Sequence, residues 1–262
     1  MRKHWKALVA VAAVVIAVVV AAIIISARPD ATAEPTPDSD NTITTGTLGF
    51  PVSDINIGEG GTATAPDGRT PIGYDGSCDS AAQAAAAYTP LLSDINIGTW
   101  PKQKETLLSV AIDGPWVEDA TATTDAVVDV AQENELPGLF DGGWMSQTDV
   151  AAGGMYRMVS CESEGAALIQ VLYGGLNAGD TLPEGFFGTQ SMELTWDGDW
   201  KISDALLRTD PELEQRLPDQ GPSGGYTDEG TGVMPVLTSD VADYYFDDLS
   251  REGWIEYANA KR

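Results

Sequence analysis

The chain begins with its longest apolar stretch. Residues 7–27 hold no charged side chain, and Arg2, Lys3 and Lys6 precede them. About 20 apolar residues, each rising 1.5 Å along a helix, cross the ~30 Å hydrocarbon layer of a bilayer. The pattern therefore predicts a transmembrane helix, with residues 1–28 as a short leader and membrane anchor.

The charges around this run predict its orientation. After Arg28 only acidic residues follow for some distance, and the cytoplasmic flanks of membrane helices are enriched in Lys and Arg. We therefore expect a single-pass protein of the cell membrane, with its N-terminus in the cytoplasm and its body outside. A cleaved signal peptide, cut near Ala27 or Ala33, is the alternative, although the apolar part of such peptides usually spans about 7–15 residues. Both interpretations export residues 29–262.

Residues 29–68 are rich in Pro, Thr, Asp, Gly and Ser and show no sustained apolar period. Such a segment buries too little apolar surface to offset the entropy of ordering it. We predict a disordered, acidic stalk here.

One hexapeptide of this segment is repeated. Ser-Asp-Ile-Asn-Ile-Gly stands at 53–58 and, without change, at 93–98. Two copies are too few for a repeat fold. Either the duplication has no role, or the stalk copy competes for whatever the second copy binds.

Three helices are predicted next. The first covers residues 76–89, with Ser77 as its N-terminal cap, a nearly all-Ala interior, and Pro90 ending or kinking it. The second covers residues 101–114 and the third residues 115–134; both begin with a proline, which the first turn of a helix favours.

After these helices, the spacing of apolar residues changes from a helical period to an alternation of apolar and polar positions. Strands are predicted over residues 155–161, 166–172, 190–196 and 200–206. The last two form a hairpin around Asp197-Gly198-Asp199, with a three-residue loop because that register keeps the apolar residues on one face. That face holds Met192, Leu194, Trp196, Trp200 and Ile202. The opposite face holds Glu193, Thr195, Lys201 and Ser203.

The order of elements predicts an α+β domain over residues 69–218, with three helices packed on one face of a curved antiparallel sheet of about four strands. The tail, residues 219–262, opens as a linker rich in Gly and Pro. Residues 238–251 then form an amphipathic helix, which either docks back on the domain or binds a partner. Its apolar stripe consists of Val241, Tyr244, Tyr245 and Leu249.

Charge and cysteines limit the function. The chain has 14 basic and 40 acidic residues, and its net charge is −26. A body this acidic repels phosphate backbones, which argues against nucleic-acid binding. The excess charge either serves solubility or attracts cations or a basic partner.

The two cysteines, Cys78 and Cys161, are expected to form a structural disulfide outside the cytoplasm, with two free thiols as the alternative.

Catalytic chemistry finds little support in the sequence. The only histidine is His4, beside the anchor, which excludes Ser-His-Asp and Cys-His systems and His-ligated zinc in the body. We expect no catalytic residue, no cofactor and no metal site, and we interpret Asp197-Gly198-Asp199 as a turn rather than a calcium loop. The candidates for a pocket with a carboxylate and a tyrosine are Tyr88, Tyr173, Asp204 and Glu193, although the strand register points Glu193 outward.

Two segments carry a resemblance. Thr70-Pro71-Ile72-Gly73-Tyr74 leads into the Ala-rich helix, and Leu194 to Ile202 reads Leu-Thr-Trp-Asp-Gly-Asp-Trp-Lys-Ile. This order resembles a family of actinobacterial membrane-anchored proteins of unassigned function, often associated with conjugative elements. These are similar to the extracytoplasmic scaffold subunit of type IV secretion systems. The resemblance covers residues 70–218 and implies a nuclear-transport-factor-2-like cone fold, an interaction role and no catalytic residue. Pro90 departs from the uninterrupted helix of that family.

Three functions are weighed. The first is a scaffold that contacts protein partners in an envelope complex, with self-association left open. The second is a small-molecule binder or an enzyme with a pocket in the cone, and the third is a sensor of envelope stress or of the cell wall. If Met192, Trp196 and Trp200 fill the concave face of the sheet, a ligand has no room there.

Overall fold

The computed structural model describes residues 44–94, 99–133, 146–177, 184–206, 211–225 and 232–262. These residues form an α+β unit in which helices pack on a large antiparallel sheet, as the order of elements predicted. None of the helices in these ranges is long and apolar enough to cross a membrane. The apolar run 7–27 and the first part of the predicted stalk lie outside the described residues.

The helices of the described residues are α2 (Cys78–Ser93), α3 (Trp100–Val110), α4 (Pro115–Glu133), α5 (Val150–Gly153), α6 (Pro211–Arg216) and α7 (Ser239–Tyr245). Helices α2, α3 and α4 lie where the three helices were predicted, with ends that differ by up to four residues. The strands are β1 (Ala63–Thr64), β2 (Pro71–Ile72), β3 (Ser146–Asp149), β4 (Met155–Cys161), β5 (Ala166–Asn177), β6 (Glu184–Trp196), β7 (Trp200–Ala205), β8 (Gly224–Gly225) and β9 (Trp254–Glu256).

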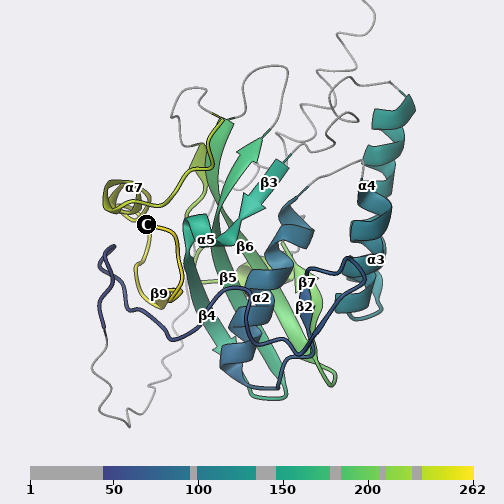
Figure 1. Ribbon diagram of the computed structural model, residues 1–262, viewed down its shortest axis with the longest axis horizontal. Coiled ribbons are helices and arrows are strands. Elements are labelled where there is room, and N and C mark those ends of the chain that lie inside the picture. Colours follow the sequence, from purple (N-terminus) through teal and green to yellow (C-terminus); the bar gives the residue numbers. More distant parts are fainter. Residues whose placement is uncertain (1–43, 95–98, 134–145, 178–183, 207–210, 226–231) are drawn as a thin grey trace, which may run out of the picture. The chain divides into compact units, whose positions relative to one another are not determined.

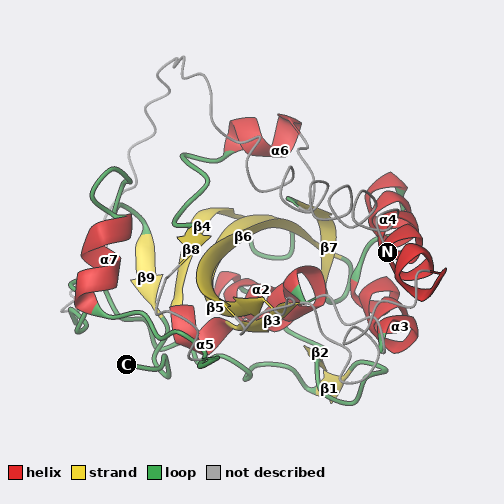
Figure 2. Ribbon diagram, turned by 90° about the horizontal axis from the view of Figure 1, so that it is seen from above, coloured by secondary structure: helices red, strands yellow, loops and turns green. Residues whose placement is uncertain are grey.

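The main sheet has the strand order β7-β6-β5-β4-β9, and all its pairings are antiparallel. Two short strands extend it, since β3 pairs with the far end of β5 and β8 with β6. The sheet is strongly curved, and α2 lies within the curve while α6 lies outside it (Figures 1 and 2). The sheet is therefore larger than the four strands expected, because the C-terminal tail adds β9 and the segment before β4 adds β3.

The predicted hairpin register is confirmed next to the loop, whereas an irregularity between Glu193 and Leu194 shifts the pairing by one residue further away. Trp196 pairs with Trp200 across a three-residue loop, in which Gly198 adopts a positive φ of 73°. A left-handed glycine at this position is typical of such loops. The predicted apolar face is turned toward α2, and Met192, Leu194, Trp200 and Ile202 are buried in the main core.

Helix α2 fills the concave side of the sheet. Its alanines are small enough to let the helix sit close to the strands, and those at positions 81, 82, 84, 85 and 86 are almost completely buried. Pro90 lies inside the helix, so it does not end α2, which was one of the two alternatives, and α2 continues to Ser93. A proline inside a helix costs about 3 kcal/mol, whereas burying Leu91 and Leu92 stabilises the extension by about 1.5–3 kcal/mol each.

The other face of the sheet carries a second core. Helix α7 packs there through Val241 and Tyr245 against Met155, Leu172 and Phe187 of the sheet. The C-terminal helix thus docks back on the domain, which was one of the two alternatives. It is shorter than residues 238–251, and Tyr244, expected on its apolar stripe, is 77% exposed. The helices consequently lie on both faces of the sheet and not on one.

Much of the predicted stalk belongs to the domain. Residues 44–58, here called the strap, run along residues 254–262, here called the C-terminal arm, and place Phe50 and Ile55 in the two cores. The compact unit accordingly starts at Ile43 and reaches Arg262, instead of covering 69–218. The prediction of a disordered segment up to residue 68 is therefore wrong for the residues from 44 onward.

Candidate functional site

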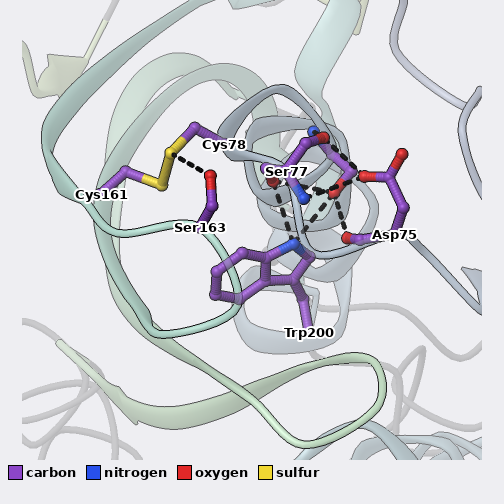
Figure 3. Close-up of a disulfide and its surroundings, with 7 residues drawn as sticks. Asp75, Ser77, Cys78, Cys161, Ser163 and Trp200 are labelled. Carbon is purple, nitrogen blue, oxygen red and sulfur yellow. Dashed lines mark hydrogen bonds between the residues drawn. A yellow bond between two sulfur atoms is a disulfide. The ribbon is translucent and has the colours of Figure 1, made fainter.

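The disulfide joins the start of α2 to the end of β4. Cys78 and Cys161 are bonded, as expected, with their Cα atoms 5.9 Å apart and a separation of 83 positions in sequence. Ser77, the predicted cap, accepts a hydrogen bond from the backbone amide of Ser80 at 3.2 Å. The disulfide fixes the start of α2 to the sheet, and Trp200 of the hairpin lies beside it (Figure 3).

Trp200 lies next to this junction. Its indole nitrogen donates to Ser80 Oγ at 3.0 Å and to the Ser77 carbonyl at 3.2 Å (Figure 3). The hydroxyl of Tyr88, about two turns further along α2, donates to the backbone carbonyl of Trp200 at 3.0 Å. The polar atoms of these aromatic residues are therefore satisfied inside the core and support the packing of α2 on the hairpin.

The hairpin loop is bonded to the segment before α2. The carboxylate of Asp199 accepts hydrogen bonds from the backbone amides of Gly73, Tyr74 and Trp200, at 2.7, 2.9 and 2.9 Å. A carboxylate that accepts several backbone amides is well stabilised in place. The two sequence segments that carry the family resemblance thus meet at this side chain, and the Asp197-Gly198-Asp199 loop has a structural role.

The structure separates the proposed pocket residues. Glu193 lies on the face away from α2 and forms an ion pair with Arg216 of α6 at 2.6 Å. Asp204 stands opposite Glu193 in the strand register and so shares its face. Tyr88 is in the core on the other side of the sheet. A carboxylate–tyrosine pair built from these residues is therefore not formed, and Glu193 points outward as its register predicted.

Tyr173 does have a carboxylate beside it, but a different one. Asp94, the C-terminal cap of α2, lies near Tyr173 of β5 and Thr148 of β3. Burial raises the pKa of Asp94 to about 6, although Thr148 next to it favours the charged form. Burial also raises the pKa of Tyr173, and the charge of Asp94 adds to the shift. Among the described residues, Asp94 Oδ1 is buried without a hydrogen-bond partner.

A shallow groove lies on the outer side of α2. Its volume is about 390 Å³, and its walls include Ala87 and Pro90 of α2, Ile57 of the strap, Thr148 of β3 and Leu176 of β5. These walls are mainly apolar. The groove is an open surface feature and does not reach the packed interior between α2 and the hairpin.

Seven cations of the described residues are already bonded to other groups of the chain. Six cations form ion pairs with carboxylates: Lys104, Arg157, Arg216, Arg251, Lys261 and Arg262. A seventh, Lys201, donates to the backbone carbonyl of Ser109. Within the described ranges no three His, Cys, Asp or Glu side chains are grouped as metal ligands would be. The charge left for partners is therefore mostly negative.

Comparison with protein-family models, with curated proteins and with solved structures finds no match for this chain.

Proposed function

We propose that this protein is a membrane-anchored interaction protein, a scaffold whose folded body stands outside the cytoplasm. In this proposal residues 7–27 form the anchor, and the body, of the nuclear-transport-factor-2-like cone type, contacts other proteins of a conjugative or secretion apparatus. The observation that carries the proposal is the filled concave face of the sheet. Met192, Leu194 and Trp200 occupy it together with α2, so surfaces and not a deep cavity are offered to partners.

The disulfide supports the placement of the body outside the cytoplasm. Disulfides persist outside the cytoplasm and are rare within it, and Cys78 and Cys161 are bonded here. The acidic surface supports a protein partner with a basic face, because opposite charges accelerate and orient association. These two features fit a body exported to the cell surface.

Topology is tested first. Alkaline phosphatase fused after Arg262 is active only outside the cytoplasm, and β-galactosidase fused at the same position is active only inside it. We expect phosphatase activity alone. Galactosidase activity alone would overturn the extracytoplasmic placement.

The partner is tested by crosslinking in cells. A photoreactive amino acid replaces Tyr244, which is exposed on α7, or Leu108, which is exposed on α3; a matched control replaces the buried Tyr245. Capture of channel or ATPase subunits of a transfer apparatus from the exposed positions, and not from the control, is the expected result. Capture of no such subunit from either exposed position would count against the scaffold.

A second candidate function, a small-ligand binder, is favoured by the buried Asp94 next to Tyr173. A buried carboxyl with an unpartnered oxygen is suited to accept a hydrogen bond from a small polar molecule. Imidazole and guanidine are simple probes of such a site. Thermal stabilisation by either probe that disappears in Asp94→Asn would support binding, and equal effects on both proteins would exclude it.

A further inference from the structure

Strand β3 pairs with a neighbour on one side only. It pairs with β5 along its whole length, and among the described residues no other strand pairs with it. The outermost strands of the main sheet are covered in comparison, because the amide of Ile112 bonds to Ile202 of β7 and the strap bonds to Glu256 of β9. The outer edge of β3 is therefore a place at which the sheet can accept a further strand.

The apolar groove beside α2 follows this edge and reaches both faces of the sheet. Strand β3 lies next to α2 (Figures 1 and 2) and contributes residues to the walls of the groove. Ala87 and Pro90 form its wall on the face that α2 covers, and Leu176 and Met234 form another wall. Leu176 lies an even number of residues after Leu172 of the second core, so it faces away from α2. A segment along β3 would thus place successive side chains against two different walls.

The backbone groups at this edge are mainly acceptors. The carboxylate of Asp94 bonds to the backbone amide of Thr148, which therefore points away from β5 and is already taken. The carbonyl of Thr148 points to the same side, since both groups of one residue share an edge in an antiparallel ladder. Pro90 has no amide hydrogen, so the carbonyl of Ala86 lacks the donor that a regular helix supplies. An occupant of the groove must donate hydrogen bonds.

Carboxylates stand beside the groove. Asp149 belongs to its wall and is paired with Lys261. Glu59, which follows the wall residues of the strap, is exposed. The chain as a whole has a net charge of −26. A segment that carries Lys or Arg therefore complements this edge in charge as well as in hydrogen-bond donors.

We infer that the edge of β3 binds a short, extended and basic segment of a partner protein, in which apolar residues alternate with Lys or Arg. The main-chain amides of the segment donate to β3, and its apolar side chains contact Ala87 and Pro90. The stems of its basic side chains cover Leu176, and their charges reach toward Asp149. The inference rests on the proposed interaction role and names one surface and the partner chemistry that this surface selects. Because β3 has four residues, the paired stretch is about as short.

Binding is measured with a defined probe, the dye-labelled hexapeptide Lys-Val-Lys-Val-Lys-Val, by fluorescence polarisation on the full-length protein. We expect saturable binding. The same peptide with N-methyl groups on alternate backbone amides keeps its charge but loses donors, and should bind at least ten-fold more weakly. Glu-Val-Glu-Val-Glu-Val should also bind at least ten-fold more weakly. Equal affinity for the methylated peptide would show attraction by charge alone, and equal affinity for the acidic peptide would refute charge selection; either result would overturn the inference.

The groove is located by a substitution with a matched control. Ala87→Trp fills the groove from a half-exposed position of α2 and should weaken binding at least ten-fold. Ala122→Trp, at an exposed alanine of α4, should leave the affinity unchanged. Equal affinities of the two variants would overturn the inference. If Ala87→Trp does not fold, a photoreactive residue at Met234 should crosslink the probe, whereas the same residue at Ala122 should not; equal crosslinking from both positions would overturn it as well.

This inference and the proposed scaffold fail separately. If the probe does not bind, the edge proposal is wrong, whereas the captures from Tyr244 and Leu108 test other surfaces and are unaffected. If those captures fail while the probe binds and Ala87→Trp weakens it, the scaffold is wrong and the edge proposal is supported. If the full-length chain sediments as a dimer that Ala87→Trp dissociates, a second copy occupies the groove and the basic partner is refuted.

Discussion

The buried guanidinium of Arg157 and the partly buried carboxylate of Asp219 form a two-point ion pair, with N–O distances of 2.5 and 3.0 Å. The Arg157 side chain is 3% exposed, and its Nε also donates to Gln170 at 2.7 Å. Asp219 belongs to the segment predicted to be a linker, and its backbone carbonyl accepts from Gln170 at 2.8 Å. The pair thus ties this segment to the sheet face opposite α2.

Loss of the Asp219 carboxylate is expected to destabilise the protein strongly. Breaking a buried ion pair costs about 3–5 kcal/mol, because the remaining charge is left buried without a partner. Asp219→Ala should lower the free energy of unfolding by about 3 kcal/mol in urea titrations. Asp243→Ala, which removes a pair with Arg251 and whose side chain is 72% exposed, is the matched control. A similarly small change for both variants would show that the Arg157 pair stabilises nothing.

The strap is expected to contribute to stability in the way a core segment does. Replacing a buried Ile by Ala costs about 2–5 kcal/mol, so Ile55→Ala should lower the free energy of unfolding by about 2 kcal/mol or more. Asp54→Ala, at the exposed neighbouring position, should change it by less than about 0.5 kcal/mol. A flexible linker would give equally small values for the two substitutions.

The hydrogen bond between Tyr88 and Trp200 is open to a conservative test. Tyr88→Phe removes only the hydroxyl and leaves the buried carbonyl of Trp200 without that donor. The expected loss is about 1 kcal/mol in the free energy of unfolding. Tyr244→Phe, on the exposed side of α7, should have no measurable effect. No loss in Tyr88→Phe would mean that another donor or water replaces the hydroxyl.

The disulfide should stabilise the domain by restricting the unfolded chain. A loop of more than 80 residues corresponds to about 4–5 kcal/mol in the chain-entropy description, and measured values often fall lower. Cys78→Ser with Cys161→Ser is expected to lower the urea midpoint, and a reductant should have this effect on the wild type only. If reductant shifts the midpoint of the double variant as well, its effect does not come from this bond.

The stability of the protein should depend on pH through Asp94. Because the pKa of Asp94 rises from its ordinary value near 4 to about 6 on folding, the folded state binds the proton more tightly than the unfolded chain does. Its contribution is thus fully present below pH 4 and is lost as the pH rises through 6, amounting to about 3 kcal/mol. Asp94→Asn, whose side chain stays neutral, should remove this slope and raise the melting temperature at pH 7.5. A slope that persists unchanged in Asp94→Asn would assign it to other groups.

The elements that could be predicted are those with a local signal. Ser77 precedes an alanine-rich segment, and capping is decided within a few residues. The hairpin register follows from the alternation of Trp196, Trp200 and their neighbours, since a slip of one residue would expose the apolar face. The two cysteines were predicted to pair because an exported chain with two cysteines offers few alternatives.

The strap and Asp94 lack such a signal. Phe50 and Ile55 are single apolar residues in a polar segment, and they are buried by partners about 200 positions later in the chain. Asp94 is buried because β3 and β5 close over the end of α2, and neither strand is near it in sequence. Patterns within a short window describe local periodicity only, so long-range pairing and the pKa shifts that follow from it could not be predicted.

The pairing of the strap with the C-terminal arm also has a consequence for the order of events during synthesis. Ser53 emerges from the ribosome early, whereas Glu256, to which it bonds, is 203 positions later. Contacts of such separation form late in folding because a long loop must close first. The strap is therefore synthesised first but cannot pack until the C-terminal arm has been made. Until then the Phe50 and Ile55 side chains are exposed and can be bound by chaperones.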